Sequence, residues 1–223
     1  MTDARPLVIV LHGIFRTAWS MKIYELALRW QGYAVLNVTY PSLRHDLGKI
    51  AELTEAKIMR SPKIGRATKI HFVTHSMGGL ITRYMLDRSP SLREKTASIV
   101  MLNPPNQGSE VADFAKSTGW MSPLYRFFYG PAGQQLTTEH AVHHPPLRDI
   151  PVGVIAGGKS GNPFAHHAFG HDQKHDGTVA HNRMRLDEST PFVEVHATHN
   201  SILCSPAAIR QTLHFLHERK FKS

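Results

Sequence analysis

Six short apolar runs recur along the chain, separated by stretches whose apolar residues repeat at helical spacing. The runs are rich in β-branched residues and apolar on both faces, a pattern typical of strands that helices cover on both sides. They span residues 6–11, 34–39, 69–74, 97–102, 151–156 and 192–196. We therefore expect about six strands in a sheet that is mostly parallel.

The stretches between the runs predict helices at 20–31, 46–59, 79–88 and 206–219. The last helix begins at Ser205-Pro206, an N-cap followed by proline at the first helical position. Alternating strands and helices are typical of an open α/β sheet flanked by helices. The chain has 223 residues, no internal repeat and no linker-like segment, so we expect one domain over residues 1–223.

Two longer stretches interrupt this alternation. Residues 106–150 form an insertion that we expect to be irregular, and its aromatic segment 119–130 is a candidate for a small lid. Trp120, Phe127 and Phe128 are equally candidates for an acyl-binding wall and for plain core. Residues 157–181 are rich in glycine and histidine. Ligands bind beyond the carboxyl ends of the strands in such sheets, where loops of this kind meet.

The composition is strongly basic. Lys and Arg total 26 against 17 Asp and Glu, which gives a formal net charge of +9 with histidine neutral. The basic residues are scattered, without zinc-finger spacing or a basic amphipathic helix, so we expect no nucleic-acid partner. A diffuse positive field instead favours anionic interfaces or substrates.

Two ligand-binding signatures lack the structural context that they need. The loop 166–175 holds four of the 16 histidines, but Gly170 between His167 and His171 indicates a loop rather than a helix. We expect no resident metal there and keep a zinc site as the alternative. Residues 153–160 match the G-x-x-x-x-G-K-S phosphate loop, yet their first half is a predicted strand and Pro163 stops a following helix.

The single cysteine and the N-terminal residues indicate the cellular compartment of the protein. One cysteine, Cys204, excludes an internal disulfide and is typical of a reducing compartment. It follows Ile202-Leu203, where we expect a small buried residue. The five apolar residues 7–11 are too short for a signal peptide, and no stretch approaches the ~18 apolar residues of a membrane span. We expect a cytoplasmic protein.

A candidate nucleophile follows the third run. Residues 74–79 read THSMGG, which places a serine on a tight turn between a strand and a helix, with glycines where the turn is cramped. Such a turn exposes the hydroxyl beside the N–H groups of the helix start. Ser76 is therefore the predicted nucleophile, and the N–H of Met77 is one predicted oxyanion donor.

The first run supplies the second oxyanion donor. It ends in His12-Gly13, where glycine lets the backbone curl back so that the N–H of Ile14 faces a neighbouring strand end. One such donor is worth roughly 3–4 kcal/mol of transition-state stabilisation. Phe15 and His75 adjoin the donor and the nucleophile, and we expect both to contact substrate.

A serine nucleophile needs a base, and the base needs an acid that orients it. His199 lies in the loop beyond the last run, whereas His196 lies inside the strand pattern and His75 adjoins the serine itself. We therefore predict His199 as the base. Asp176 follows the fifth run on a turn and is the predicted acid, with Asp172 on the same loop as the alternative.

These motifs resemble those of the α/β-hydrolases, and more narrowly of small bacterial lipases and carboxylesterases. The matching pieces occur in family order over nearly the whole chain: LHGIFRTAWSM (11–21), HFVTHSMGGLITRYML (71–86), VMLNPPNQGSEVAD (100–113), GPAGQQL (130–136), VGVIAG (152–157), HDGTV (175–179) and THNSIL (198–203). The resemblance implies a triad of Ser76, Asp176 and His199 and an oxyanion hole at Ile14 and Met77. It implies a minimal fold without a large cap domain, and no cofactor. Thr74 stands where the usual motif has glycine, a departure that similar lipases share.

We expect a serine hydrolase that cleaves carboxylic esters through an acyl-enzyme, as an esterase or lipase that favours short to medium acyl chains. Its expected partner is a small ester or lipid, with contact to a lipid surface. A thioesterase or acyltransferase is the alternative on the same fold, because a triad reveals neither the leaving group nor the acyl acceptor. A non-catalytic binding protein is the alternative from another class, but such a protein is expected to have lost a triad residue.

Overall fold

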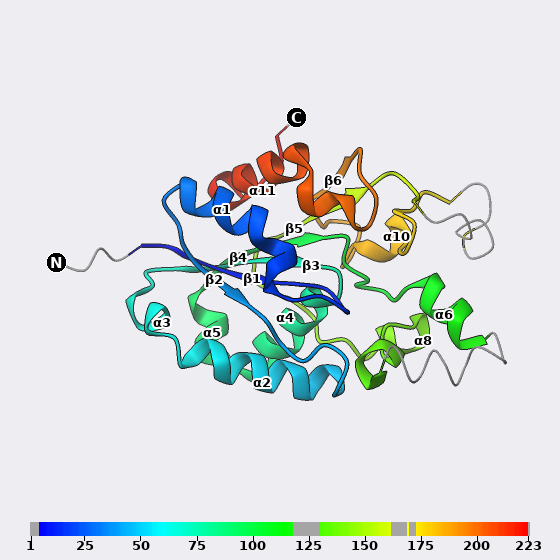
Figure 1. Ribbon diagram of the computed structural model, residues 1–223, viewed down its shortest axis with the longest axis horizontal. Helices are drawn as coiled ribbons and strands as arrows, with labels where there is room; N and C mark the ends of the chain where they lie inside the picture. Colours follow the sequence, from blue (N-terminus) through cyan, green and yellow to red (C-terminus); the bar gives the residue numbers. More distant parts are fainter. Residues whose placement is uncertain (1–4, 118–129, 162–168, 170–172, 223) are drawn as a thin grey trace.

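A six-stranded, wholly parallel sheet forms the centre of the structure, in the order β2-β1-β3-β4-β5-β6 (Figure 1). The computed structural model describes residues 5–117, 130–161, 169 and 173–222. The strands are β1 (Leu7–Leu11), β2 (Ala34–Val38), β3 (Ile70–His75), β4 (Thr96–Leu102), β5 (Val152–Gly157) and β6 (Phe192–Val195). Each lies within one residue of its predicted run, which confirms the α/β class.

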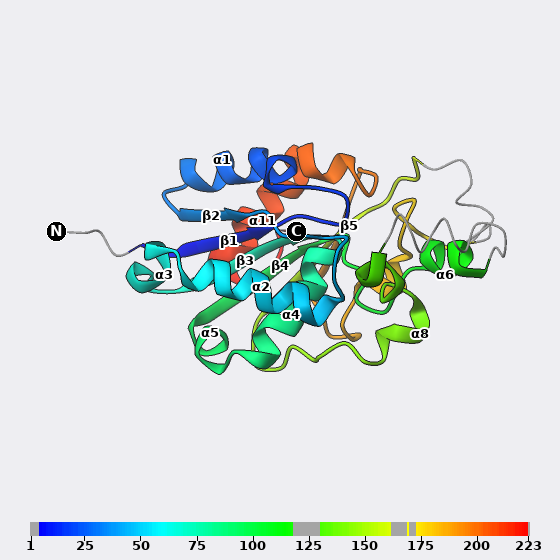
Figure 2. The same cartoon turned by 60° about the horizontal axis from the view of Figure 1, so that its bottom comes forward.

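Helices cover both faces of the sheet, as the doubly apolar strands predict. On one side lie α1 (Lys22–Trp30) and α11 (Pro206–Glu218), and on the other lie α2 (Leu47–Met59), α4 (Met77–Arg88) and α5 (Pro90–Lys95) (Figures 1 and 2). Alternate residues of β1 serve the two layers: Leu7, Ile9 and Leu11 pack with α2 and α4, and Val8 and Val10 with α1 and α11. Side chains of successive strand residues point to opposite faces, so one apolar run fills both cores.

The remaining elements are short, and the sequence periodicity did not predict them. They are η1 (Ala18–Met21), α3 (Pro62–Arg66), α6 (Glu110–Ser117), α8 (Thr138–Ala141), α10 (His181–Met184) and η2 (Ser201–Cys204). The insertion 106–150 is therefore partly helical, and the expectation of an irregular stretch was wrong for α6 and α8. Helices of four to eight residues offer too few turns for an apolar repeat to stand out.

Two predicted loops fall largely outside the described residues. Of the candidate lid 119–130, only Gly130 is described, so Trp120, Phe127 and Phe128 lie outside it. The same holds for residues 166–168 and 170–172 of the histidine-rich loop.

Cys204 is exposed, so the prediction of a buried cysteine was wrong. It ends the 3-10 helix η2, whose Ile202 and Leu203 are buried. A 3-10 helix has three residues per turn, so the residue that follows two inward-facing ones points outward. The apolar neighbours thus occupy the core and Cys204 does not.

The strand order reverses direction between β1 and β3. The chain passes from β1 to β2 at one edge and then returns to place β3 on the other side of β1. Such a reversal leaves a crevice at the carboxyl ends of the two strands. The elements α6, α8 and α10 gather beyond this edge of the sheet (Figure 1).

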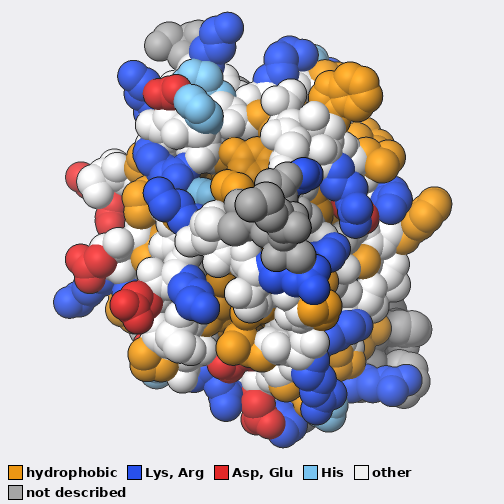
Figure 3. Space-filling view, turned by 90° about the vertical axis from the view of Figure 1, so that its left-hand side faces the viewer, with side chains coloured by type: hydrophobic (Ala, Val, Ile, Leu, Met, Phe, Trp, Pro, Cys, Tyr) orange, Lys and Arg blue, Asp and Glu red, His pale blue; other side chains and the backbone are white. Residues whose placement is uncertain are grey.

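Basic side chains are spread over the face of the molecule nearest the N-terminus rather than gathered into one patch (Figure 3). Figure 3 shows the side on which the N-terminus lies, with Lys and Arg scattered among hydrophobic and neutral groups. In the described residues, no helix is long and apolar enough to cross a membrane.

Candidate active site

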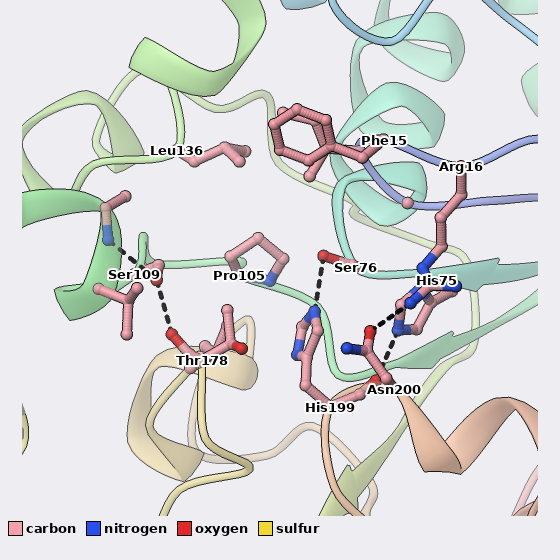
Figure 4. A pocket seen from close by; sticks show the side chains of 15 residues that line it. Phe15, Arg16, His75, Ser76, Pro105, Ser109, Leu136, Thr178, His199 and Asn200 are labelled. Atoms are coloured by element: carbon pink, nitrogen blue, oxygen red, sulfur yellow. Dashed lines mark hydrogen bonds between the residues drawn. The ribbon is translucent and has the colours of Figure 1, made fainter. Parts of the chain in front are cut away.

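Several predicted site residues meet at the carboxyl edge of the sheet, and Figure 4 shows Phe15, His75, Ser76 and His199 among them. Ser76 follows β3, Ile14 follows β1, and His199 follows β6. Asp176 precedes α10 on the loop after β5. Residues far apart in the sequence become neighbours because parallel strands end at one edge.

Ser76 occupies a strained turn. Its φ of 52° and ψ of −125° lie where residues with a side chain are rarely found. Its N–H donates to the carbonyl oxygen of Leu102 on β4 (2.9 Å), which anchors the turn to the sheet. A Cβ at Gly78 would lie 2.7 Å from the carbonyl oxygen of Leu11 and 2.8 Å from that of His12. Glycine is therefore required where α4 starts against the end of β1.

His199 links Ser76 to Asp176 by hydrogen bonds. Its Nε2 lies 3.1 Å from the Ser76 Oγ, and its Nδ1 lies 2.6 Å from the Asp176 Oδ2. Because a carboxylate oxygen accepts, the Nδ1–H donates to Asp176 and leaves Nε2 as the acceptor for the serine hydroxyl. This tautomer lets His199 remove a proton from Ser76.

Asp176 is fully buried and held by its own turn. Its Oδ1 accepts from the N–H groups of Thr178 and Val179, both at 2.8 Å. These donors satisfy one carboxylate oxygen and leave the other for the imidazole. Asp172, the sequence alternative, lies outside the described residues.

The backbone of His199 is held from three directions. Its N–H donates to the carbonyl oxygen of Asp176 (2.8 Å), and its own carbonyl accepts from the His75 Nε2 (2.8 Å). The Asn103 Nδ2 donates to the same carbonyl (3.3 Å), while the Asn103 Oδ1 accepts from the Gly157 N–H (2.7 Å). Asn103 was not predicted, and its position just after β4 is the signal that could have drawn attention to it.

His75 lies buried beneath the site in its neutral form. Because the His199 carbonyl only accepts, the Nε2 of His75 carries the proton and its Nδ1 is unprotonated. Nδ1 is buried without a partner in the described part of the chain. Burial, with His199 as the next cause, holds the pKa of His75 well below its usual range. His75 is therefore a neutral support rather than a second base.

His12 fixes the turn that leads to Ile14. Its Nδ1–H donates to the Gly13 carbonyl (2.7 Å), and its Nε2 accepts from the Tyr40 N–H (3.3 Å). The rings of His12 and Tyr40 stack at 4.1 Å, and the Tyr40 hydroxyl donates to the His12 carbonyl. Burial lowers the pKa of His12 to about 4, so this turn is built on a neutral ring at pH 7.

The two predicted oxyanion donors flank Ser76. Ile14 lines the cavity, and Met77 begins α4 directly after the serine. Neither amide N–H donates to another residue in the described ranges. Both N–H groups are thus without a protein acceptor among these residues, which an oxyanion donor requires.

A cavity of about 380 Å³ lies over Ser76. Phe15 and His75, the two predicted substrate contacts among the described residues, are in its lining, and their contact with substrate stays a prediction. Its walls also include residues that were not predicted, which are Arg16, Pro105, Ser109, Val111, Ala112, Leu136, Thr178, Val179 and Asn200. Of these, Arg16 and Asn200 adjoin predicted site residues in the sequence, which is a signal that could have found them.

The described residues contain no cluster of three His, Cys, Asp or Glu side chains placed to hold a metal ion. The site combines a serine hydroxyl, an imidazole and a carboxylate in one continuous series of hydrogen bonds. This set suits nucleophilic acyl transfer.

A sequence profile described as "Alpha/beta hydrolase family" matches residues 8–211. The chain belongs to the alpha/beta hydrolase family. The match spans all six strands, the turn at Ser76 and the loop at His199, so it confirms the family resemblance seen in the motifs.

Sequence relatives of this alpha/beta hydrolase include two bacterial triacylglycerol lipases. Those of Pseudarthrobacter phenanthrenivorans and Burkholderia plantarii are each 34% identical to it over 80 residues. The match covers 33% of this chain but only 24% and 22% of the two lipases. The similarity is therefore to a part of those proteins.

Solved structures of lipases and esterases share the fold of this alpha/beta hydrolase. The mature lipase BlEst2 of Bacillus licheniformis superimposes with a TM-score of 0.77 at 20% identity, covering 98% of this chain and 94% of that one. The metagenomic carboxyl esterase MGS0156 gives 0.71 at 18% identity, covering 89% and 66%. At sequence identities of 20% and 18%, the similarity shows a shared fold and no more.

Proposed function

We propose that this alpha/beta hydrolase cleaves carboxylic esters with Ser76 as nucleophile. The observation that carries the proposal is the continuous hydrogen-bond chain Ser76–His199–Asp176 at the floor of an open cavity. The likeness to lipases and esterases supports it. A protein that only binds its ligand would need neither these linked hydrogen bonds nor the strained backbone of Ser76.

In the proposed reaction, the Ser76 Oγ attacks the acyl carbon while the His199 Nε2 takes its proton. The N–H groups of Ile14 and Met77 bind the oxyanion of the tetrahedral intermediate. His199 then returns the proton to the departing alcohol, leaving an acyl group on Ser76. Water repeats the sequence and releases the acid, with Asp176 orienting the imidazole throughout.

We propose short to medium acyl chains as the preferred substrates. The cavity of about 380 Å³ lies near the lower end of the range for ligand pockets in proteins. The apolar side chains of Pro105 and Leu136 lie on one side of Ser76 (Figure 4), and Val111 also lines the cavity. A thioesterase or acyltransferase stays the alternative, because the same residues would handle those substrates.

Contact with an anionic lipid surface is a further part of the proposal. Four apolar side chains form an exposed stripe along η1 and α1, at Trp19, Ile23, Leu26 and Trp30. The two tryptophans are 80% and 89% exposed. Lys22 and Arg29 flank the stripe and share Glu25 between them. With a net charge of +9, the chain complements a negative interface.

The test of the proposed function is covalent labelling together with substitution. A fluorophosphonate probe is expected to modify Ser76, as located by mass spectrometry of the labelled peptide. Ser76→Ala should lose roughly 10⁴-fold or more of the activity on p-nitrophenyl butyrate while unfolding at a similar temperature. Ser189→Ala, at an exposed serine, is the matched control. Unchanged hydrolysis by Ser76→Ala would overturn the proposal.

A further inference from the structure

Arg16 places a positive charge in the wall of the cavity. Among the described residues that line the cavity, it is the one Lys or Arg side chain, and no Asp or Glu is present. The nearby Asp176 carboxylate is fully buried and engaged with His199. The positive charge of Arg16 therefore faces the cavity without an acidic neighbour in its lining.

The guanidinium is positioned by the loop that carries His199. Its Nη2 donates to the Asn200 Oδ1 at 2.7 Å, and no other described residue accepts a hydrogen bond from it. No carboxylate pairs with Arg16 among the described residues. A guanidinium has five N–H donors in a planar fork that matches carboxylates and phosphates, so most of its donors stay available.

Arg16 and Asn200 lie together on one side of Ser76, whereas Leu136 and Ser109 lie on the other (Figure 4). The His199 Nε2 must protonate the departing alcohol, so the alcohol part of an ester lies beside His199. Asn200 follows His199 directly, which places Arg16 and Asn200 next to that alcohol. The apolar wall on the opposite side is left for the acyl chain.

We propose that Arg16 and Asn200 form a subsite for an anionic group, a carboxylate or a phosphate, carried by the alcohol part of the ester. This subsite rests on the proposed function of Ser76 and His199 and names the substrate class. Asn200 holds the guanidinium in place and can donate its own amide N–H to the anion. The positive charge of Arg16 acts at the floor of the cavity. After burial and His199, it is a further cause that lowers the pKa of His75.

The test compares matched esters that differ in one anionic group. One pair is 1-butyrylglycerol and 1-butyrylglycerol 3-phosphate, and the other is propyl butyrate and O-butyryl-3-hydroxypropanoate. Butyrate release is measured for the native protein, Arg16→Gln and Arg16→Lys. Lys95→Gln is the control for net charge, because Lys95 is exposed at the end of α5, outside the cavity lining.

We expect the native protein to prefer the anionic member of at least one pair. Arg16→Gln should lower kcat/KM on that member by about 10- to 100-fold, mainly through KM, since a hydrogen-bonded charge pair contributes in this range. It should change the neutral esters less than about 3-fold. Arg16→Lys should recover part of the loss, and Lys95→Gln should change the activity on neither ester. The pair that shows the preference tells phosphate from carboxylate.

Two outcomes would overturn the proposal. One is a native protein that prefers the neutral ester in both pairs. The other is an equal loss on charged and neutral esters in Arg16→Gln, which would mean that Arg16 only ties its loop to Asn200.

A binding measurement separates the subsite from the proposed chemistry. Calorimetry with glycerol 3-phosphate and 3-hydroxypropanoate on the Ser76→Ala protein requires no turnover. Binding that Arg16→Gln abolishes supports the subsite even if the esters are not cleaved. Binding of neither anion contradicts the subsite and leaves the proposal for Ser76 to its own test.

Discussion

The Nε2 of His75 lies 2.8 Å from the carbonyl oxygen of His199, so the residue before the proposed nucleophile supports the backbone of the proposed base. Asn103 donates to the same carbonyl from the end of β4. The loop that carries His199 is thus fastened to two neighbouring strands. The His199 ring is therefore held in one orientation by this fixed backbone and by its two hydrogen bonds, to Ser76 and to Asp176.

Asn103 is expected to act as a positioning residue. Asn103→Gly keeps the left-handed backbone of this position (φ 49°) but removes the amide that holds the His199 loop. We expect kcat to fall about 10- to 100-fold with little change in KM, because a small misplacement of the base weakens proton transfer. Steady-state kinetics on p-nitrophenyl butyrate measure the split. A rise in KM at constant kcat would refute the positioning role.

Gly78 is expected to tolerate no side chain. The Cβ of Gly78→Ala would press on the carbonyl oxygens of Leu11 and His12, which should lower the free energy of unfolding by about 1–3 kcal/mol. Gly65→Ala is the matched control, since a Cβ there meets nothing within 4 Å on helix α3. Urea unfolding measures both. Equal stability of the two variants would contradict the close approach of α4 to β1.

Buried neutral histidines predict a loss of stability in mild acid. Burial, with Arg219 and Lys69 as further causes, lowers the pKa of His71 to about 4. Between pH 6.5 and 4 the unfolded chain therefore binds a proton that the folded chain refuses, and the free energy of unfolding falls as the pH falls. At pH 5 this group alone should cost roughly 2 kcal/mol.

His71→Phe should reduce the difference in unfolding free energy between pH 7 and pH 5 by that amount. The hydrogen bond from His71 to Ser98 is lost at both pH values and so cancels in the comparison. His196→Gln, at an exposed histidine without a carboxylate partner among the described residues, is the matched control. Urea unfolding at the two pH values decides the matter. An unaltered pH dependence in His71→Phe would show that this histidine charges freely in the folded state.

The exposed stripe on η1 and α1 should mediate binding to anionic vesicles. Trp19→Ser combined with Trp30→Ser is expected to weaken cosedimentation with phosphatidylglycerol vesicles by about 10-fold or more, because each tryptophan buries a large apolar surface in the interface. Val142→Ser, at another exposed apolar residue, is the control. Binding should also weaken as salt screens the charge. Concentration-dependent dimerisation lost with the two tryptophans would instead assign the stripe to a second copy of the chain.

Much of the fold and of the candidate site could be predicted from local sequence. The six strands matched their runs because doubly covered strands are apolar throughout. The turn at Ser76 could be read from its glycine at position 78, which the approach of β1 requires. His199 stood out from the other histidines by its place just beyond a strand end, because the ends of parallel strands converge.

Other features arise only from contacts between distant segments. The positions of Arg16 and Asn103 beyond strand ends indicate that they lie near the site, but only the packed sheet brings them to Asn200 and His199. The exposure of Cys204 likewise follows from the direction of one short 3-10 helix. The sequence by itself determined the strands, the turn at Ser76 and the predicted partners of Ser76, because these depend on periodicity and local backbone geometry. Tertiary structure alone decided which side chains support and border them, because that depends on which strand ends lie side by side.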